Sequence, residues 1–222
     1  MNCSARLWRP VAELLADDIE VCHGELRGTS VDECVARLLA RLPRRFAVAG
    51  LSLGGIVAMA LARQAPGRVS GLGLFSTNPR PPTETQRRSW DRARAALRSG
   101  GSAREVQAQL LPALLSEEAR SGPLAAEVLS MAEDVGQQGL QEQLSMQASR
   151  IDERPGLVRL RVPTLVVAGG ADTMCPPTWH QEVHALVPGS CRVVLEGVGH
   201  LSPLEAPVEV ARQLAGWLAG HP

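Results

Sequence analysis

Two hydrophobic patterns alternate along this chain. Short apolar runs predict strands, at Ile19–Cys22, Arg45–Ala49, Val69–Ser76, Pro163–Ala168 and Arg192–Leu195. Between these runs, apolar residues recur at helical spacing, as in Trp8–Ala16, in the segment that follows the N-cap candidate Ser30, and in the last helix from Val210 to Leu218. Strands that alternate with helices indicate an α/β fold, with a mostly parallel central sheet flanked by helices.

The pattern changes at Asn78. From there to about residue 154 the chain is polar and has helical spacing without a strand signal. Two capping-box pairs and two later apolar stretches predict its helices, at Thr83 with Gln86, Ser102 with Glu105, Leu124–Met131 and Leu140–Arg150. We therefore divide the chain into a core of residues 1–77 and 155–222 and an inserted helical cap of residues 78–154.

One strand runs directly into a candidate nucleophile. The apolar residues Phe46–Ala49 lead into Gly50-Leu51-Ser52-Leu53-Gly54, and a helical pattern follows. A serine aimed out of the top of a sheet needs a sharp strand-to-helix turn, and side chains two residues before and after it would collide there. We therefore expect Gly50 and Gly54 both to be required. A glycine-rich turn without chemistry is the alternative reading of this motif.

A serine needs a base, and the base needs an orienting acid. The strand at Val162–Ala168 ends in a glycine turn that reaches Asp172, and the strand at Arg192–Leu195 ends in a loop that reaches His200. Taken singly, Asp172 is explained as the N-cap of a helix and His200 as a histidine in a loop. Three such residues at the carboxyl ends of successive strands predict a catalytic triad.

Composition narrows the possible partners. The chain has 222 residues, of which 45% are hydrophobic, and its 23 basic residues balance 23 acidic ones. This balance and the low aromatic content of 3% argue against nucleic-acid and membrane surfaces as partners. All the basic residues are Arg, so the lysine of a nucleotide-binding P-loop is absent. We expect neither a cofactor nor a metal. The five cysteines without a C-x-x-C pair favour reduced thiols in the cytoplasm.

Taken together, these motifs resemble those of the α/β-hydrolase family, and the resemblance runs from about Arg6 to Trp217. It rests on the Ser52 turn, Gln64–Val69, Pro163–Val166 and Gly199–Glu205. The resemblance implies an α/β-hydrolase type of fold, with Ser52 as nucleophile, His200 as general base and acid, and Asp172 as orienting carboxylate. The strand after the Ser52 helix ends in Ser76-Thr77-Asn78 without a carboxylate, which favours Asp172 as the acid.

The chain departs from this family at its start. Members usually have three strands before the nucleophile, the third ending in a turn that gives one oxyanion donor. The resemblance places that donor on Met1 and the other on the Leu53 N–H. We expect the Phe46–Ala49 strand to be central and covered on both sides. The Ile19 strand must then pair with it or leave a gap, and we expect the natural product to extend upstream by roughly 15–30 residues, enough for a strand and a turn.

Several other residues have a sequence pattern similar to that of a functional site. His23-Gly24 resembles an oxyanion turn but follows the Ile19 strand, and His180 with His184 has the spacing of a shared metal but more often marks a solvated helix face. Cys175 is better explained as a buried structural thiol. We expect surface or hinge ion pairs at the end of the cap, from Arg150, Asp152 and Arg154.

Three classes of function stay open. The first is a serine hydrolase that cleaves a small ester, lactone or thioester through an acyl-enzyme. The second is acyl transfer, cyclisation or lyase chemistry on the same fold, and the third is an inactive, truncated hydrolase-like protein. The expected partner is a small-molecule substrate, and a homodimer stays open.

Overall fold

A parallel four-stranded sheet forms the centre of the molecule. The computed structural model describes residues 1–15, 17 and 19–220. Within them, the strands lie in the order β1-β2-β3-β4, all parallel. Their bounds are Phe46–Leu51 for β1, Val69–Phe75 for β2, Thr164–Gly169 for β3 and Cys191–Leu195 for β4. The α/β class is confirmed, and four of the five expected strands are present.

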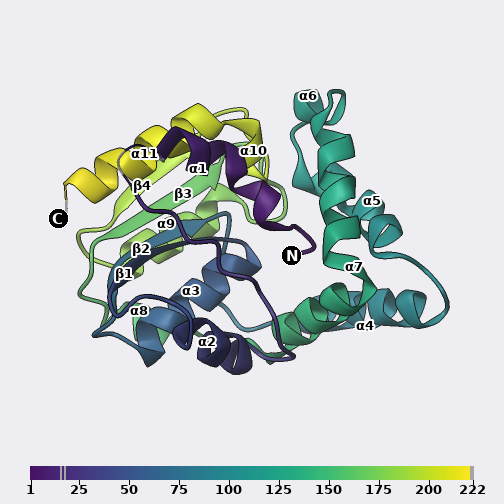
Figure 1. Ribbon diagram of the computed structural model, residues 1–222, viewed down its shortest axis with the longest axis horizontal. Coiled ribbons are helices and arrows are strands. Elements are labelled where there is room, and N and C mark those ends of the chain that lie inside the picture. The colour runs from purple at the N-terminus through teal and green to yellow at the C-terminus, as the bar shows by residue number, and fades with distance from the viewer. Residues whose placement is uncertain (16, 18, 221–222) are drawn as a thin grey trace.

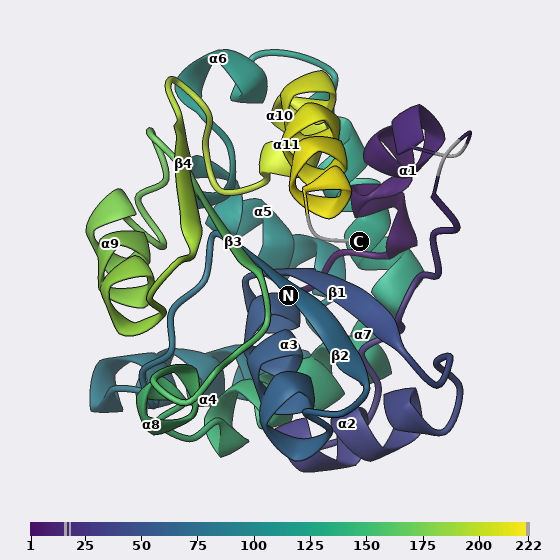
Figure 2. The same ribbon diagram turned by 90° about the vertical axis from the view of Figure 1, so that its left-hand side faces the viewer.

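Helices cover both faces of this sheet (Figures 1 and 2). One face carries α2 (Val31–Leu39), α3 (Leu53–Gln64) and α9 (Pro177–Leu186), whose buried residues share a core with β2 and β3. The other carries α1 (Arg9–Leu15), α10 (Ser202–Glu205) and α11 (Pro207–Ala219). The end predicted for the first helix, Ala16, lies outside the described residues. No helix in the described part of the chain is long and apolar enough to cross a membrane.

A separate group of helices lies between β2 and β3 in the chain. It consists of α4 (Glu84–Arg98), α5 (Ala103–Leu114), α6 (Glu117–Arg120) and α7 (Leu124–Ser149), and the short α8 (Arg154–Leu157) follows. Both capping boxes are present, at Thr83 and Ser102. The two helices expected after residue 124 are both present within α7, where they meet at a kink at Gly136, whose φ of 69° and ψ of 177° are not helical. Figure 1 shows this group beside the sheet, with the N-terminus between the two.

The two ends of this helical group are tied together. The Glu153 N–H donates to the Pro79 carbonyl over 2.8 Å. The Glu153 carboxylate, 3% exposed, accepts hydrogen bonds from the Arg63 guanidinium of α3 over 2.9 and 3.1 Å. An ion pair that is buried on one side holds its partners in a defined geometry. The exit and return of the helical group are thus fixed to the core at α3.

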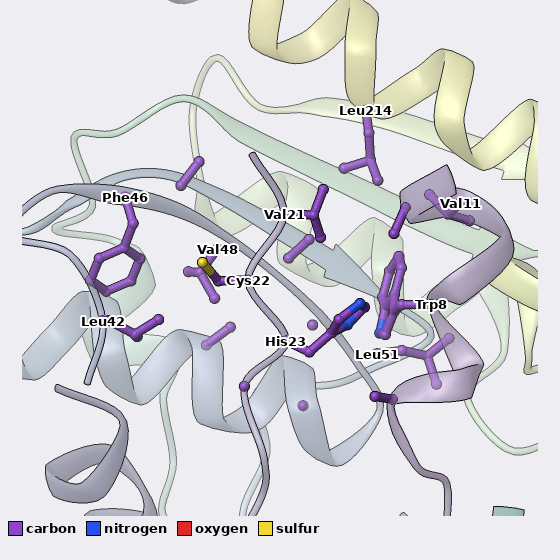
Figure 3. A pocket seen from close by; sticks show the side chains of 18 of the residues that line it. Trp8, Val11, Val21, Cys22, His23, Leu42, Phe46, Val48, Leu51 and Leu214 are labelled. Atoms are coloured by element: carbon purple, nitrogen blue, oxygen red, sulfur yellow. The ribbon is translucent and has the colours of Figure 1, made fainter. Parts of the chain in front are cut away.

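The strand expected at Ile19–Cys22 is wrong. The described residues from 19 to 27 have no regular secondary structure, and β1 pairs only with β2, so it is an edge strand rather than a central one. Ala47 and Ala49 of β1 are exposed. A cavity of about 540 Å³ separates this segment from β1, which is why no strand pairing forms. Figure 3 shows its apolar walls, with Val21, Cys22 and His23 opposite β1.

Candidate active site

Ser52 occupies a strained turn between β1 and α3. Its φ of 56° lies in the left-handed region, which a non-glycine residue adopts only where its surroundings hold it there. Two hydrogen bonds do so. The Ser52 N–H donates to the Phe75 carbonyl over 2.9 Å, and the Ser52 carbonyl accepts from the Thr77 hydroxyl over 2.8 Å. The end of β2 thus fixes the backbone of Ser52 on both sides.

The two glycines that flank Ser52 differ in the space around them. A Cβ at Gly50 would lie 2.2 Å from the Gly54 carbonyl oxygen, so only glycine fits there. A Cβ at Gly54 would meet no heavy atom within 4 Å outside its own helix, so the expected collision at Gly54 is wrong. The reason is the open edge of the sheet, because Gly54 borders the cavity beside β1.

Asp172 and His200 form a buried pair beyond β3 and β4. Oδ2 of Asp172 lies 2.8 Å from Nδ1 of His200, and the two residues are 3% and 1% exposed. Oδ1 of Asp172 accepts from the N–H groups of Met174 (2.9 Å) and Cys175 (2.8 Å). Burial raises the pKa of Asp172, but the hydrogen bond and charge of His200 and the Cys175 N–H outweigh it, so this pKa lies below its usual range.

The ionised carboxylate fixes the imidazole of His200. A carboxylate can only accept hydrogen bonds, so Nδ1 holds a proton and Nε2 is the nitrogen left to exchange a proton with a substrate. The backbone of the His200 loop is held as well, since the His200 N–H donates to the Leu114 carbonyl over 3.1 Å. A Cβ at Gly199 would lie 2.5 Å from the Ser116 nitrogen, which accounts for glycine before the histidine. The arrangement suits a general base.

Ser52 and His200 border the same cavity, which has a volume of about 870 Å³. The other walls come from the helical group, from the loop after Asp172 and from α9, and include Trp90, Leu110, Gln147, Arg150, Met174 and Trp179. The cavity is large enough for a small organic molecule. A hydroxyl and an imidazole therefore face the same space.

Of the two residues expected as oxyanion donors, Leu53 follows Ser52 directly and Met1 borders the cavity. Leu53 is the first residue of α3, so its N–H lies in the turn whose donors have no partner inside the helix. Met1 is held at the cavity by Asn2, which is fully buried: the Asn2 N–H donates to Gln143 over 2.6 Å, and its side-chain amide donates to Gln107 over 3.0 Å. Sequence reasoning did not single out Asn2.

His180, which was expected to lie with His184 on a solvated helix face, contacts Thr77 next to Ser52. That expectation is wrong for His180, which is fully buried and whose Nε2 accepts from the Thr77 N–H over 3.0 Å. Burial lowers its pKa, so it is neutral. His184 is exposed and contacts the Ser190 hydroxyl over 2.8 Å, so the two imidazoles have separate partners. His180 thus supports Thr77, which in turn holds Ser52.

One cluster in the described residues has a metal-like set of donor atoms. It consists of Asp172, Cys175 and His200, whose donor atoms lie within 4.8 Å of one another. A thiol must lose its proton to bind a metal, and burial strongly raises the pKa of Cys175. Asp172 and His200 are already bonded to each other. These residues fit a proton-transfer pair and a buried thiol, as expected for Cys175.

The hinge ion pairs expected near residue 152 are present only in part. Arg154 pairs with Asp152, with Nε 2.8 Å from Oδ1. Arg150 is different, since its side chain is buried and turns into the cavity, where it contacts the amides of Gln147 and Gln86 instead of a carboxylate. Burial lowers the pKa of Arg150, with the nearby Arg87 cation acting in the same direction. The expectation of an ion pair for Arg150 is wrong within the described residues.

Comparison with known proteins assigns the family. A model of the alpha/beta hydrolase family matches residues 2–213. The chain belongs to the α/β hydrolase family. It is therefore an enzyme of the hydrolase class, and the resemblance inferred from the sequence motifs is confirmed.

Three similar proteins span most of this hydrolase. The pimeloyl-[acyl-carrier protein] methyl ester esterase of Aliivibrio salmonicida is 27% identical over 87% of this chain and 80% of its own length. RutD of Escherichia coli O81 is 30% identical over 92% of this chain and 83% of its own. The structure of a thermophilic esterase from Thermogutta terrifontis, malate bound, covers 99% of this chain and 87% of its own, with 26% identity and a TM-score of 0.89.

Proposed function

We propose that this hydrolase cleaves a small ester, lactone or thioester through an acyl-enzyme on Ser52. The observation that carries the proposal is the buried Asp172–His200 pair, 2.8 Å apart, at a cavity that Ser52 also borders. Two similar proteins, from Aliivibrio salmonicida and Thermogutta terrifontis, are esterases by name, which supports ester cleavage, whereas RutD carries the name of a carbamate hydrolase.

The proposed reaction has two halves. Oγ of Ser52 attacks the carbonyl carbon while Nε2 of His200 takes its proton, and Asp172 stabilises the imidazolium that forms. His200 then gives the proton to the leaving alcohol, and an acyl-enzyme remains. In the second half, a water attacks the acyl carbon with His200 again as base, and Ser52 is regenerated.

The negative charge that develops on the carbonyl oxygen of the substrate during attack needs hydrogen-bond donors. The Leu53 N–H at the start of α3 supplies one, in a turn where the helix dipole favours negative charge. We assign the second to Met1, which Asn2 holds at the cavity. Each such donor is worth roughly 2.7–4 kcal/mol of transition-state stabilisation. The helices α4–α7 act as the cap, since they supply most of the wall opposite Ser52 and exclude water.

A fluorophosphonate probe tests this proposal, because it reacts with a serine only where a base and an oxyanion hole activate it. We expect mass spectrometry to find the adduct on Ser52, and Ser52→Ala to abolish it. Undiminished labelling of the variant would reject Ser52 as nucleophile, and absence of labelling would favour an inactive protein. Product analysis with added alcohols or amines separates hydrolysis from acyl transfer.

A further inference from the structure

Arg150 lies in the wall of the active-site cavity, at the end of α7. Its side chain is only 6% exposed, although the residue borders the cavity that Ser52 and His200 share. The guanidinium lies over the Trp90 ring, 5.4 Å from the ring centroid. A guanidinium at this distance from an aromatic ring makes a cation–π contact, which helps to position it.

The contacts of this guanidinium are all neutral. One terminal nitrogen donates to Oε1 of Gln147 over 2.9 Å, and the other donates to Oε1 of Gln86 over 2.7 Å. Nε is buried and donates to no described acceptor. The oxygen of Gln86 also accepts from the Thr83 N–H of the capping box over 3.0 Å, so Gln86 itself is fixed. The two amides position Arg150 but leave its charge without a counter-ion.

The charges around this wall do not compensate Arg150. Arg92 also borders the cavity, and Arg87 is close enough to lower the pKa of Arg150. Glu105 is the one carboxylate among the described residues at the cavity wall, and it is exposed, with Oε2 bound to the Ser102 N–H. Asp172 is bonded to His200. Cations therefore predominate in this cavity.

A buried charge is costly unless a partner of opposite sign meets it. A purely structural link between α7 and α4 would need only a neutral donor at this position. Arg150 instead borders the cavity with an uncompensated charge, and a guanidinium is the fork of donors that binds a carboxylate.

We propose that Arg150 binds a carboxylate of the substrate, so that the enzyme acts on esters that carry a second, free carboxylate. This inference rests on the proposed function. Substrates of this class are the half-esters of dicarboxylic acids and the lactones of hydroxy-dicarboxylic acids. The free carboxylate meets Arg150 while the carbonyl to be cleaved lies at Ser52, and the cavity of about 870 Å³ holds both ends.

A matched pair of esters tests the charge preference. Monomethyl adipate ends in a carboxylate, and methyl adipamate ends in a neutral amide of the same size; the half-esters of succinate and glutarate vary the length. We expect kcat/KM to favour the best half-ester over its amide by roughly 10- to 100-fold, mainly through KM. Arg150→Gln should reduce that ratio to near one, and Arg150→Lys should keep part of it. Equal kcat/KM for each acid and its amide in the wild-type enzyme would overturn the inference.

A matched control separates direct contact from general charge. Arg88 lies on α4, is exposed and pairs with Glu84, so Arg88→Gln removes the same charge from the same helical group without touching the cavity. We expect Arg88→Gln to keep the full preference for the half-ester. A loss equal to that of Arg150→Gln would count against Arg150 as the binding residue.

A second measurement needs no turnover. Adipate should slow fluorophosphonate labelling of Ser52 at constant ionic strength, adipamide should not, and Arg150→Gln should abolish the protection. If Ser52 labels but dicarboxylates neither protect it nor bind in a calorimeter, the inference fails while the proposed function stands. If Ser52 never labels but adipate binds the wild type and not Arg150→Gln, the proposed function fails while the anion site stands.

Discussion

The hydrogen bond between Asp172 and His200 determines which imidazole nitrogen faces the cavity. In Asp172→Asn, the side-chain oxygen still accepts from the Met174 and Cys175 N–H groups, so the new NH₂ group meets Nδ1 of His200. An NH₂ group cannot accept, so the proton moves to Nε2 and the base is lost. We expect kcat to fall about 10⁴-fold, and further in His200→Ala. Unchanged esterase turnover in either variant, with native thermal unfolding, would reject the role of that residue.

His180 makes stability depend on pH. Burial holds its pKa in the folded protein below the value of about 6.5 that it has in the unfolded chain. Below that pH the unfolded chain takes up a proton and the folded protein does not, so the free energy of unfolding falls as pH drops through 6.5 and is unaffected well above it. At about pH 7.5, His180→Gln should unfold at lower urea than the wild type, because the packing around Thr77 is disturbed. Between about pH 7.5 and about pH 5.5, however, the variant should lose less stability than the wild type, because the group that titrates is gone.

The exposed neighbour on the same helix provides the control. His184 lies four residues on and contacts only the Ser190 hydroxyl among its described side-chain partners. We expect His184→Gln to keep the pH dependence of the wild type. If His180→Gln and wild type lose stability in parallel between these pH values, His180 is not the group that titrates.

At the scale of elements, the turn between β1 and α3 offers a matched pair of glycines. Gly50→Ala places a Cβ against the Gly54 carbonyl, and we expect a loss of roughly 1–3 kcal/mol or more together with the Ser52 adduct. Gly54→Ala finds open space and removes a flexible residue from the helix, so it should be neutral or stabilising by up to about 1 kcal/mol. Urea unfolding and fluorophosphonate labelling measure both effects. Equal damage from the two substitutions would mean that the open edge beside Gly54 is closed in solution.

The elements that could be predicted from the sequence are those whose signals are local. Capping boxes at Thr83 and Ser102 and the strands β1 to β4 depend on residues within a few positions of one another, and all are present. Ile19–Cys22 has an apolar pattern as well, but a strand exists only where another strand pairs with it. A cavity lies between this segment and β1, so the local pattern was insufficient.

At the scale of the whole molecule, the site too divides into residues with a local sequence signal and residues whose roles depend on distant contacts. Ser52, Asp172 and His200 could be found because each follows a strand, and the carboxyl ends of parallel strands meet at one edge of a sheet. Asn2 and Arg150 could not, because their roles depend on contacts more than 60 residues away in the chain, such as Arg150 with Gln86 (a separation of 64 residues). The spacing of these residues carries no signal of that packing.

The open side of the sheet follows from the hydrogen bonds of β1. The N–H groups of Phe46 and Ser52, at the two ends of this strand, donate to Arg68 and Phe75, so the even-numbered amides of β1 face β2. Because successive amides of a strand point in opposite directions, those of Ala47 and Ala49 face the open side. No acceptor among the described residues pairs with these two groups, whose residues are exposed.

Amide hydrogen exchange, resolved by residue in NMR spectra, tests this arrangement within a single strand. The Val48 and Gly50 amides, bonded toward β2, should exchange slowly, whereas those of Ala47 and Ala49 should exchange faster by several orders of magnitude, since water reaches them without opening of the sheet. The four residues share one strand and one global stability, so each slow amide is the control for its fast neighbour. Slow exchange at all four amides would mean that a further strand pairs with this edge of the sheet. Such a strand would come from outside the described residues or from a second copy. It would make β1 the central strand that its sequence pattern indicates.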